Sequence, residues 1–236
     1  MQSENSPTPR IKVCGITLLG DLDFLAAAGV DSIGLNFVPS SRRCVSVELG
    51  QSLSGRAAEL GLLRVAVVMD PAPTALTALL SQVEVDAVQL HGREQPDLAE
   101  ACLGLPIIKA TSWTGRREEV ELVRIWRPLA DSGTLIAFLI DAYAPVTGGG
   151  TGNTACWGLL QPRPPELLGV PLILAGGLNA ENVAGAVIAT NPVGVDTASG
   201  VELSPGVKSE ERVRKFVENL AGQWKTLLTS SQQPLK

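Results

Sequence analysis

Eight short apolar runs recur along the chain, and their spacing limits the available folds more than any other feature. Their starts lie about 20 to 35 residues apart, the length of a strand followed by a helix. Each run is almost wholly apolar instead of alternating, which is typical of parallel strands covered on both faces. We expect strands at Ile11–Cys14, Ser32–Phe37, Arg64–Met69, Ala87–Leu90, Ile107–Ala110, Leu135–Asp141, Pro171–Ala175 and Val193–Thr197.

Helix-like segments with recognisable ends lie between these runs. Acidic residues open the segment after the first run and Gly29 closes it, and we expect the next helix over Val47–Gly61. Thr74, Asn179 and Ser209 stand where capping side chains are expected, and they predict helices over Ala75–Leu80, from Ala180 onward and from Glu210 onward.

Eight strand–helix units in about 220 residues favour the α/β class and a single closed (β/α)8 barrel with parallel strands. The alternative is an open, doubly wound sheet with fewer strands. No break in composition suggests a second domain. We expect a flexible N-terminal tail over residues 1–10, the barrel domain over 11–222 and a C-terminal tail over 223–236.

Composition excludes several classes of function. A formal net charge of −5 gives no basic surface for nucleic acid, and no run of 18 or more apolar residues could span a membrane. Cys14, Cys44, Cys102 and Cys156 lack ligand-like spacing, so free thiols and a cytoplasmic location are expected. With His91 as the only histidine, a metal centre is disfavoured, and we expect no cofactor.

The barrel assignment places the active site at the carboxyl ends of the strands. Cys14 ends the first run and is either a buried small hydrophobe or a reactive thiol. Arg43, in the loop after the second, is either solvated or grips a substrate carboxylate with its two-pronged guanidinium. Asp141 ends the sixth after four apolar residues and either caps a loop or, with a raised pKa, donates a proton.

Other strand ends carry groups suited to binding. Gln89 and His91 share one face of the fourth strand, and we assign them a supporting, substrate-binding role. The run that includes Gly149 and Gly150 could let the backbone fold tightly over a ligand. The loops after the last two runs are glycine-rich and lead towards helix N-termini, a combination typical of phosphate sites. Their candidate residues are Gly176, Gly177, Ser199 and Gly200.

With these motifs in this order, the chain resembles the phosphoribosylanthranilate isomerase family from about Ile11 to about Leu220. The matching motifs are Lys12–Gly15, Ser41–Arg43, Gln89–Gly92, Asp141, Gly149–Gly152, Leu174–Leu178 and Ser199–Gly206. No single motif is specific, but their number and order are.

The resemblance implies an Amadori rearrangement of N-(5-phospho-β-D-ribosyl)anthranilate to 1-(2-carboxyphenylamino)-1-deoxyribulose 5-phosphate in tryptophan biosynthesis. It implies that Cys14 is the general base for the C2′ proton, that Asp141 is the general acid for the ring oxygen, and that Arg43 holds the anthranilate carboxylate. It also implies a phosphorylated small-molecule substrate and a monomer or homodimer. Helix N-termini are expected to stabilise the Cys14 thiolate, whereas burial and the substrate's anions are expected to raise the pKa of Asp141.

The chain departs from the family pattern at Asn153, Cys156 and Ala198, where a lysine, an acid and a hydroxyl are common. These changes bear on substrate affinity and loop order more than on the reaction. Three alternatives stay open: the histidine-pathway sugar isomerase, indole-glycerol-phosphate synthase with Lys109 as its catalytic lysine, and a catalytically silent phosphate-binding barrel. Cys14 argues against the first, because that family has an aspartate at this position.

Overall fold

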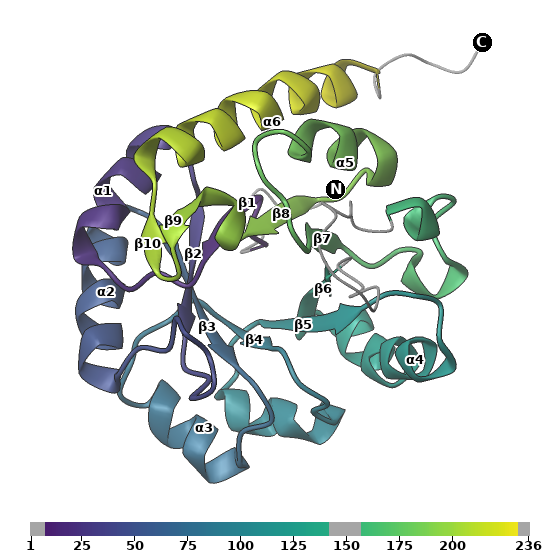
Figure 1. Ribbon diagram of the computed structural model, residues 1–236. Coiled ribbons are helices and arrows are strands. Elements are labelled where there is room, and N and C mark those ends of the chain that lie inside the picture. Colours follow the sequence, from purple (N-terminus) through teal and green to yellow (C-terminus); the bar gives the residue numbers. More distant parts are fainter. Residues whose placement is uncertain (1–7, 142–156, 231–236) are drawn as a thin grey trace.

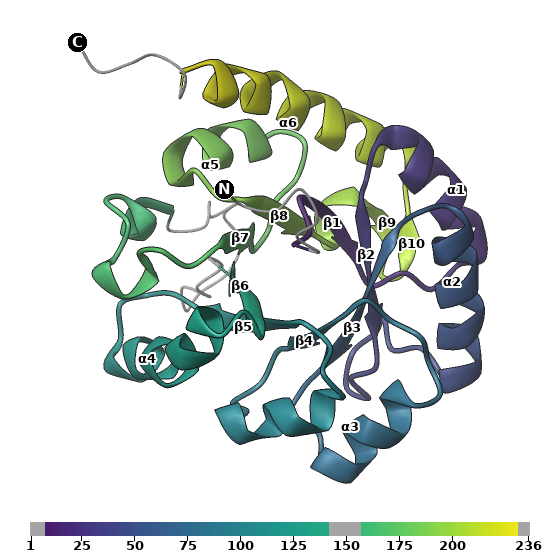
Figure 2. The ribbon, with the colours of Figure 1, turned by 180° about the vertical axis from the view of Figure 1, so that it is seen from behind.

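The computed structural model describes residues 8–141 and 157–230, and within these ranges eight parallel strands form a closed barrel in sequence order. Figure 1 views the ring of strands with the helices outside it, and Figure 2 shows the same arrangement from behind. The strands are β1 (Ile11–Cys14), β2 (Ser32–Asn36), β3 (Leu63–Val68), β4 (Ala87–Leu90), β5 (Ile107–Ser112), β6 (Leu135–Asp141), β7 (Leu172–Ala175) and β8 (Gly194–Thr197). The predicted closed barrel is therefore confirmed, and each strand lies within two residues of its predicted bounds.

Six α-helices are present in the described ranges. They are α1 (Leu19–Ala28), α2 (Val47–Glu59), α3 (Pro73–Leu80), α4 (Arg117–Asp131), α5 (Val183–Thr190) and α6 (Glu210–Ser230). Short 3-10 helices stand in place of α-helices after β4, where η1 spans Pro96–Cys102, and after β6, where η2 and η3 span Trp157–Leu160 and Pro165–Leu167. A further 3-10 turn, η4 (Ser199–Val201), and the two-stranded hairpin of β9 (Glu202–Ser204) and β10 (Val207–Lys208) follow β8.

Two of the predicted helix caps are wrong. Helix α3 begins at Pro73 instead of after Thr74, because proline suits the first helical position, where no backbone N–H is required. Asn179 caps a turn ahead of α5: its Oδ1 accepts hydrogen bonds from the backbone N–H groups of Glu181 and Asn182, and the helix itself begins at Val183. The Ser209 prediction is confirmed, since its hydroxyl oxygen accepts a hydrogen bond from the backbone N–H of Arg212.

Alternation along the strands separates two apolar layers. One face of each strand packs against the surrounding helices, and small and branched side chains from the other face fill the barrel. The interior cluster consists of Val65, Ala87, Ile108, Ala110, Ala137, Leu139, Ile173 and Ala175. Nearer the carboxyl ends of the strands, polar residues that include Asn36, Gln89 and Asp141 line the site described below, together with apolar ones.

Lys109 belongs to the outer layer. Its neighbours Ile108 and Ala110 fill the barrel, so the period of two turns Lys109 outward, where its ammonium lies 5.8 Å from the Trp126 ring centre. Its Nζ donates hydrogen bonds to Glu94 Oε2 at 2.7 Å and to the carbonyl oxygen of Gly92 at 2.8 Å. These bonds fix the loop after β4. Lys109 is therefore structural and faces away from the interior, which removes the catalytic lysine of the indole-glycerol-phosphate synthase alternative.

Replacing Lys109 by methionine is expected to lower the free energy of unfolding by about 3 kcal/mol, because it leaves the buried Glu94 carboxylate without its cation. Urea denaturation of the variant and the wild type measures the loss. The double variant Lys109→Met/Glu94→Gln should recover part of it, since no uncompensated charge remains. An unchanged urea midpoint in the single variant would show that the pair contributes nothing to stability.

Candidate active site

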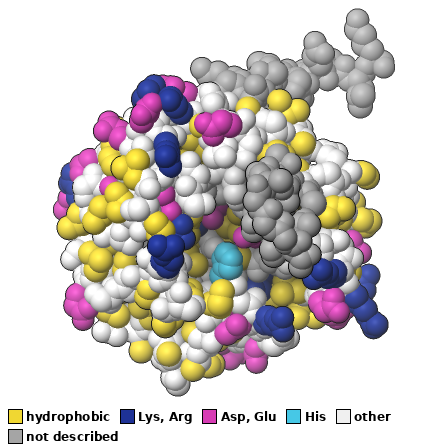
Figure 3. Space-filling model, in the orientation of Figure 1, with side chains coloured by type: hydrophobic (Ala, Val, Ile, Leu, Met, Phe, Trp, Pro, Cys, Tyr) yellow, Lys and Arg dark blue, Asp and Glu magenta, His cyan; other side chains and the backbone are white. Residues whose placement is uncertain are grey.

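A cavity of about 390 Å³ opens at the carboxyl ends of the strands. Figure 3 shows this face, hollowed near its centre where the only histidine of the chain (cyan) is visible. Most of the predicted site residues line the cavity, and Gly200 directly follows one of them. Gly149 and Gly150 lie outside the described residues. The predicted residues that line the cavity are Cys14, Arg43, Gln89, His91, Asp141, Gly176, Gly177 and Ser199.

Cys14 reaches the cavity because two glycines beside it leave room. Gly34 is its partner on β2, and a Cβ there would lie 2.7 Å from Cys14 Sγ. Gly15 has a φ of +74°, and a Cβ there would lie 2.3 Å from Cδ of Arg43. The bare backbone at both positions therefore lets the thiol and the Arg43 side chain approach the same corner of the cavity.

The electrostatic environment of Cys14 differs from our expectation. Burial raises the pKa of its thiol, and the ammonium groups of Lys12 and Lys208 oppose this effect. We expected helix N-termini to supply the stabilisation. The nearby positive charges come instead from side chains on β1 and β10, while Asp196 on β8 acts in the opposite direction.

Asp141 stands on a different side of the same cavity. It ends β6, and its neighbours in the closed barrel are β5 and β7, so neither strand next to β6 is the β1 strand that carries Cys14. Leu139 lines the cavity from the same face of β6, two residues earlier. The topology thus brings a thiol and a carboxyl group to two separate walls of one cavity, the arrangement that acid–base catalysis on a bound sugar requires.

Gln89 and His91 act as a pair at the end of β4. Gln89 is buried, and its Nε2 lies 2.8 Å from Nδ1 of His91. Burial lowers the pKa of His91, although the Asp141 carboxylate opposes the shift, so a neutral imidazole is favoured. With the amide donating to Nδ1, the ring proton would sit on Nε2 and could be donated to a ligand.

The loops after β7 and β8 form a backbone cradle at the cavity. Gly176 and Gly177 have positive φ values, of +94° and +67°. Glycine adopts this left-handed conformation without the steric cost that other residues incur. At Gly200 a Cβ would lie 1.9 Å from the carbonyl oxygen of Leu178, so only glycine lets the two loops meet. Within residues 8–141 and 157–230, no protein acceptor pairs with the N–H groups of Gly177, Ser199 or Gly200. Such N–H groups are suited to phosphate oxygens.

The sequence did not predict the role of the Glu202 carboxylate, which connects Arg43 and Lys208 at the edge of the cavity. Glu202, on β9, accepts two hydrogen bonds from the Arg43 guanidinium, from Nε at 2.7 Å and from Nη2 at 2.6 Å. The same carboxylate accepts from Lys208 Nζ at 2.7 Å, and that ammonium also donates to the carbonyl oxygen of Cys14 at 2.6 Å. Glu202 thus joins the hairpin after β8 to the end of β1 and to the loop after β2. Glu202 lies 159 residues from Arg43 in the sequence, so no local pattern indicates that the two side chains meet.

Acid should weaken the fold through Glu202. Burial alone would raise the pKa of this carboxyl, but hydrogen bonds from Arg43 and Lys208 outweigh it and lower the pKa to about 2. In the unfolded chain Glu202 titrates near its ordinary value, so its stabilisation is present above about pH 4.5 and is lost as pH falls towards 2. Glu202→Gln should flatten the decline in unfolding free energy across this interval, as measured by urea denaturation at several pH values. An equally steep decline in the variant would contradict this assignment.

Comparisons with known proteins agree with this geometry. The profile of the family described as N-(5′-phosphoribosyl)anthranilate (PRA) isomerase matches residues 11–219. The chain belongs to this isomerase family. Among its relatives, the N-(5′-phosphoribosyl)anthranilate isomerase of Myxococcus xanthus is 41% identical over 210 residues, covering 88% of this chain and 94% of the relative.

Solved structures of the isomerase family show the same fold. The phosphoribosylanthranilate isomerase of Thermotoga maritima superposes with a TM-score of 0.77 at 33% identity, covering 91% of this chain and 100% of that one. A crystal structure of phosphoribosylanthranilate isomerase in complex with reduced 1-(o-carboxyphenylamino)-1-deoxyribulose 5-phosphate superposes with a TM-score of 0.75 at 30% identity, again covering 91% and 100%. The resemblance inferred from the motifs is therefore confirmed, as is the TIM-barrel fold.

Membership of the isomerase family narrows the open alternatives. It excludes indole-glycerol-phosphate synthase, in agreement with the outward-facing Lys109, and it favours an isomerase over a binding barrel. Of the three departures from the family pattern, Asn153 and Cys156 lie outside the described residues, and Ala198 lines the cavity beside Ser199. None of the helices in the described ranges has the length and apolarity needed to cross a membrane.

Proposed function

We propose that this member of the family converts N-(5-phospho-β-D-ribosyl)anthranilate to 1-(2-carboxyphenylamino)-1-deoxyribulose 5-phosphate, with Cys14 as general base and Asp141 as general acid. The single observation that carries the assignment of roles is that a thiol and a carboxyl group from non-adjacent strands line one cavity beside the backbone cradle. Family membership supports the reaction itself.

Two proton transfers of the reaction would involve Asp141 and Cys14. Asp141 would donate a proton to the ring oxygen as the C1′–O bond breaks, which opens the ribose and leaves a protonated imine at C1′. Cys14, as thiolate, would then remove the C2′ proton and give an enolamine, which becomes the 2′-ketone as C1′ gains a proton and the 2′-hydroxyl loses one. No electrons leave the substrate, so the sequence of steps calls for no redox cofactor.

Two anionic ends of the substrate would hold it between these groups. The N–H groups of Gly177, Ser199 and Gly200, with Gly176 in the same loop, are suited to the 5′-phosphate. Arg43 is suited to the anthranilate carboxylate: Glu202 accepts hydrogen bonds from its Nε and Nη2, which leaves the Nη1 donors for a ligand. Fixing both ends would place the ring oxygen at the acid, Asp141, and C2′ at the base, Cys14.

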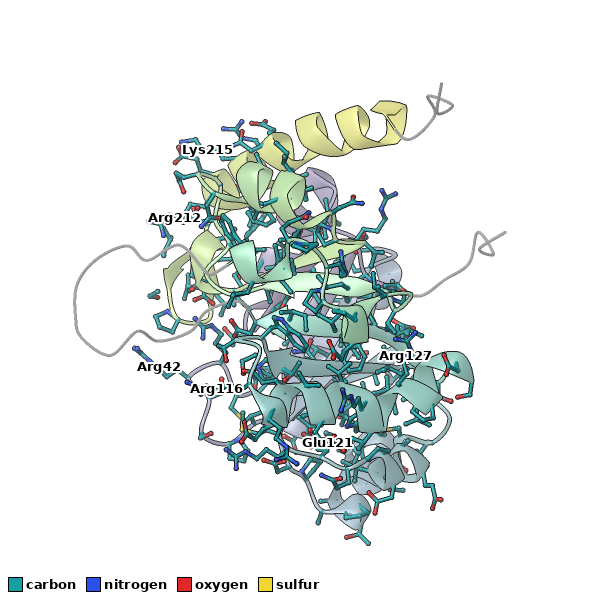
Figure 4. The ribbon with its side chains drawn as sticks, turned by 90° about the vertical axis from the view of Figure 1, so that its right-hand side faces the viewer. Arg42, Arg116, Glu121, Arg127, Arg212 and Lys215 are labelled. Carbon is teal, nitrogen blue, oxygen red and sulfur yellow. The ribbon has the colours of Figure 1, made fainter. Side chains whose placement is uncertain are left out.

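Charge on this side of the molecule would attract such a substrate. Arg42 and Arg116 belong to the loops after β2 and β5, and Figure 4 shows both at the side of the barrel where these loops lie. Neither takes part in the ion pairs of the described residues. A dianionic or trianionic substrate would meet these cations before reaching Arg43 inside the cavity.

Complementation of a bacterial tryptophan auxotroph that lacks this isomerase tests the proposal. Growth is expected with the wild-type chain and with Cys44→Ser, whose exposed thiol does not line the cavity. No growth is expected with Cys14→Ala or Asp141→Asn at matched protein levels. Failure of the folded wild-type chain to complement would overturn the proposed reaction, and rescue of a histidine auxotroph alone would favour the histidine-pathway isomerase.

The assembly and the compartment are further parts of the proposal. We expect a monomer or a homodimer in the cytoplasm; one solved structure of the family is of monomers generated from the dimeric phosphoribosylanthranilate isomerase of Thermotoga maritima. Sedimentation of the purified chain across a hundredfold range of concentration measures its mass, and a stable assembly larger than a dimer would contradict the expectation.

A further inference from the structure

A buried charge pair lies at the wall of the cavity, which its acidic member Asp196 lines, and has no part in the proposed acid–base chemistry. Lys12 on β1 and Asp196 on β8 are paired in register, and Lys12 Nζ donates a hydrogen bond to Asp196 Oδ1 at 2.9 Å. The Lys12 side chain is 0% exposed. An ion pair enclosed to this degree is costly to form, and a hydrophobic pair of the same volume would often serve stability as well. Stability alone is therefore a weak reason for its presence.

The ammonium of this pair lies beside the Cys14 thiol. Lys12 and Cys14 are two residues apart on β1, so both point to the same side of the strand. A Cβ placed on Gly34 of the neighbouring strand would lie 3.1 Å from Lys12 Nζ and 2.7 Å from Cys14 Sγ. The nitrogen and the sulfur therefore border the same small space, with no side chain of Gly34 between them.

We propose that Lys12, held in place by Asp196, is a positioning residue that stabilises the thiolate form of Cys14. This inference rests on the proposed function, in which Cys14 must lose its proton to act as a base. A cation within about 4–6 Å favours the charged form of a neighbouring acid and lowers its pKa by about 1–3 units. Lys12 does not line the cavity, so it would act through the sulfur and not on the substrate.

The other charges that face Cys14 are accounted for. From β10, Lys208 donates to the Cys14 carbonyl oxygen and is paired with Glu202. From the loop after β2, Arg43 is engaged by the same carboxylate. Asp196 on β8 raises the pKa of the thiol, whereas Lys12 lowers it more strongly than either Asp196 or Lys208 affects it. Among these groups, Lys12 is therefore the one that most opposes the rise in the Cys14 pKa that burial causes.

The pH dependence of alkylation tests this role in the free enzyme. The rate at which iodoacetamide modifies Cys14 is followed by mass spectrometry of the Cys14 peptide, which separates it from the other thiols. Lys12→Met, which keeps volume but loses charge, should raise the apparent pKa of Cys14 by at least about one unit, a tenfold loss of thiolate below the pKa. Asp196→Asn keeps an oxygen that can accept the hydrogen bond from Lys12 Nζ but loses the negative charge, so it should lower the pKa of Cys14. The pH profile of kcat/KM should move in the same direction as the alkylation profile.

Shifts of the Cys14 pKa in opposite directions in these two variants would indicate an electrostatic effect. A purely structural role of the pair would not make the direction of the shift depend on which charge is removed. If Lys12→Met does not fold, Lys12→Met/Asp196→Asn removes both charges and should still raise the pKa, because the effect of Lys12 is the larger. Lys109→Met is the matched control, since it removes another buried lysine that is paired with Glu94 on the outer layer. The Cys14 profile should be unchanged in it.

An unchanged or lowered pKa in Lys12→Met, or in the double variant where the single one does not fold, would overturn the inference. So would shifts of the same sign in Lys12→Met and Asp196→Asn. The proposed function fails separately: if Cys14→Ala retained full turnover, Cys14 would not be the base, even with the alkylation shifts as expected. Conversely, an inactive Cys14→Ala variant together with an unmoved thiol pKa would leave the base assigned and Lys12 without this role.

Discussion

Cys14→Ala is expected to lower kcat by about 10³-fold, within the 10²- to 10⁴-fold range that a positioned general base contributes. The variant loses the group that removes the C2′ proton but keeps Arg43 and the backbone cradle, so KM should change little. Steady-state kinetics with freshly prepared phosphoribosylanthranilate measures both constants. The loss should appear in kcat because the thiolate acts on the substrate after it is bound.

Two further variants sharpen this expectation. Cys14→Ser keeps the size and polarity of the side chain but replaces the thiol by a far weaker acid, so its kcat should fall almost as far as that of the alanine variant. Cys44→Ala, which changes an exposed thiol outside the cavity, should leave kcat unchanged. If Cys14→Ser retained a kcat within threefold of the wild type, proton removal by the sulfur would be excluded.

Asp141→Asn is expected to lower kcat by about 10²- to 10⁴-fold for a different reason. Asparagine preserves the shape of the side chain and can donate a hydrogen bond, but it has no acidic proton for the ring oxygen. Ring opening should therefore become the slow step. KM should remain close to the wild-type value, because the phosphate and carboxylate contacts come from other loops.

An isotope effect separates the two roles. With substrate deuterated at C2′, the residual activity of Cys14→Ala should show a large primary isotope effect, because breaking the C2′–H bond limits its rate. Asp141→Asn should show an effect close to one, because ring opening precedes that step. The reverse pattern would exchange the roles of the two residues, and a large effect in both would remove Asp141 from the ring-opening step.

The site depends on contacts that no short segment of sequence contains. Arg43 and Glu202 are 159 residues apart, and Lys12 and Asp196 are 184 apart. Each pair forms because closure of the barrel brings β1 next to both β2 and β8. The motif that contains Glu202 could be recognised as part of the family pattern. That Glu202 pairs with Arg43 could not be predicted, because the contact depends on the hairpin of β9 and β10, which brings the carboxylate back over the end of β1.

Local structure was predictable only where a single physical cause dominates. The strands were predictable because short, continuous apolar runs are typical of parallel strands that are buried on both faces. Thr74 and Asn179 were assigned to the wrong cap positions, because several polar residues near a helix start can satisfy the same N–H groups and packing selects among them. The 3-10 segment η1 replaced an expected helix; it begins at Pro96 and ends at Cys102, and Leu103 after it adopts a left-handed conformation.

The sequence by itself determined the order and nearly the bounds of eight strands, the closed barrel, and the chemical identities of the thiol, the carboxyl and the glycine loops at the strand ends. Only the tertiary structure decided which charges surround the thiol, that Lys109 faces outward and that Glu202 holds Arg43. The reason is physical: a strand or a loop is selected by forces among near neighbours in the chain, whereas the pKa of a buried group depends on whichever charges the closed fold places beside it.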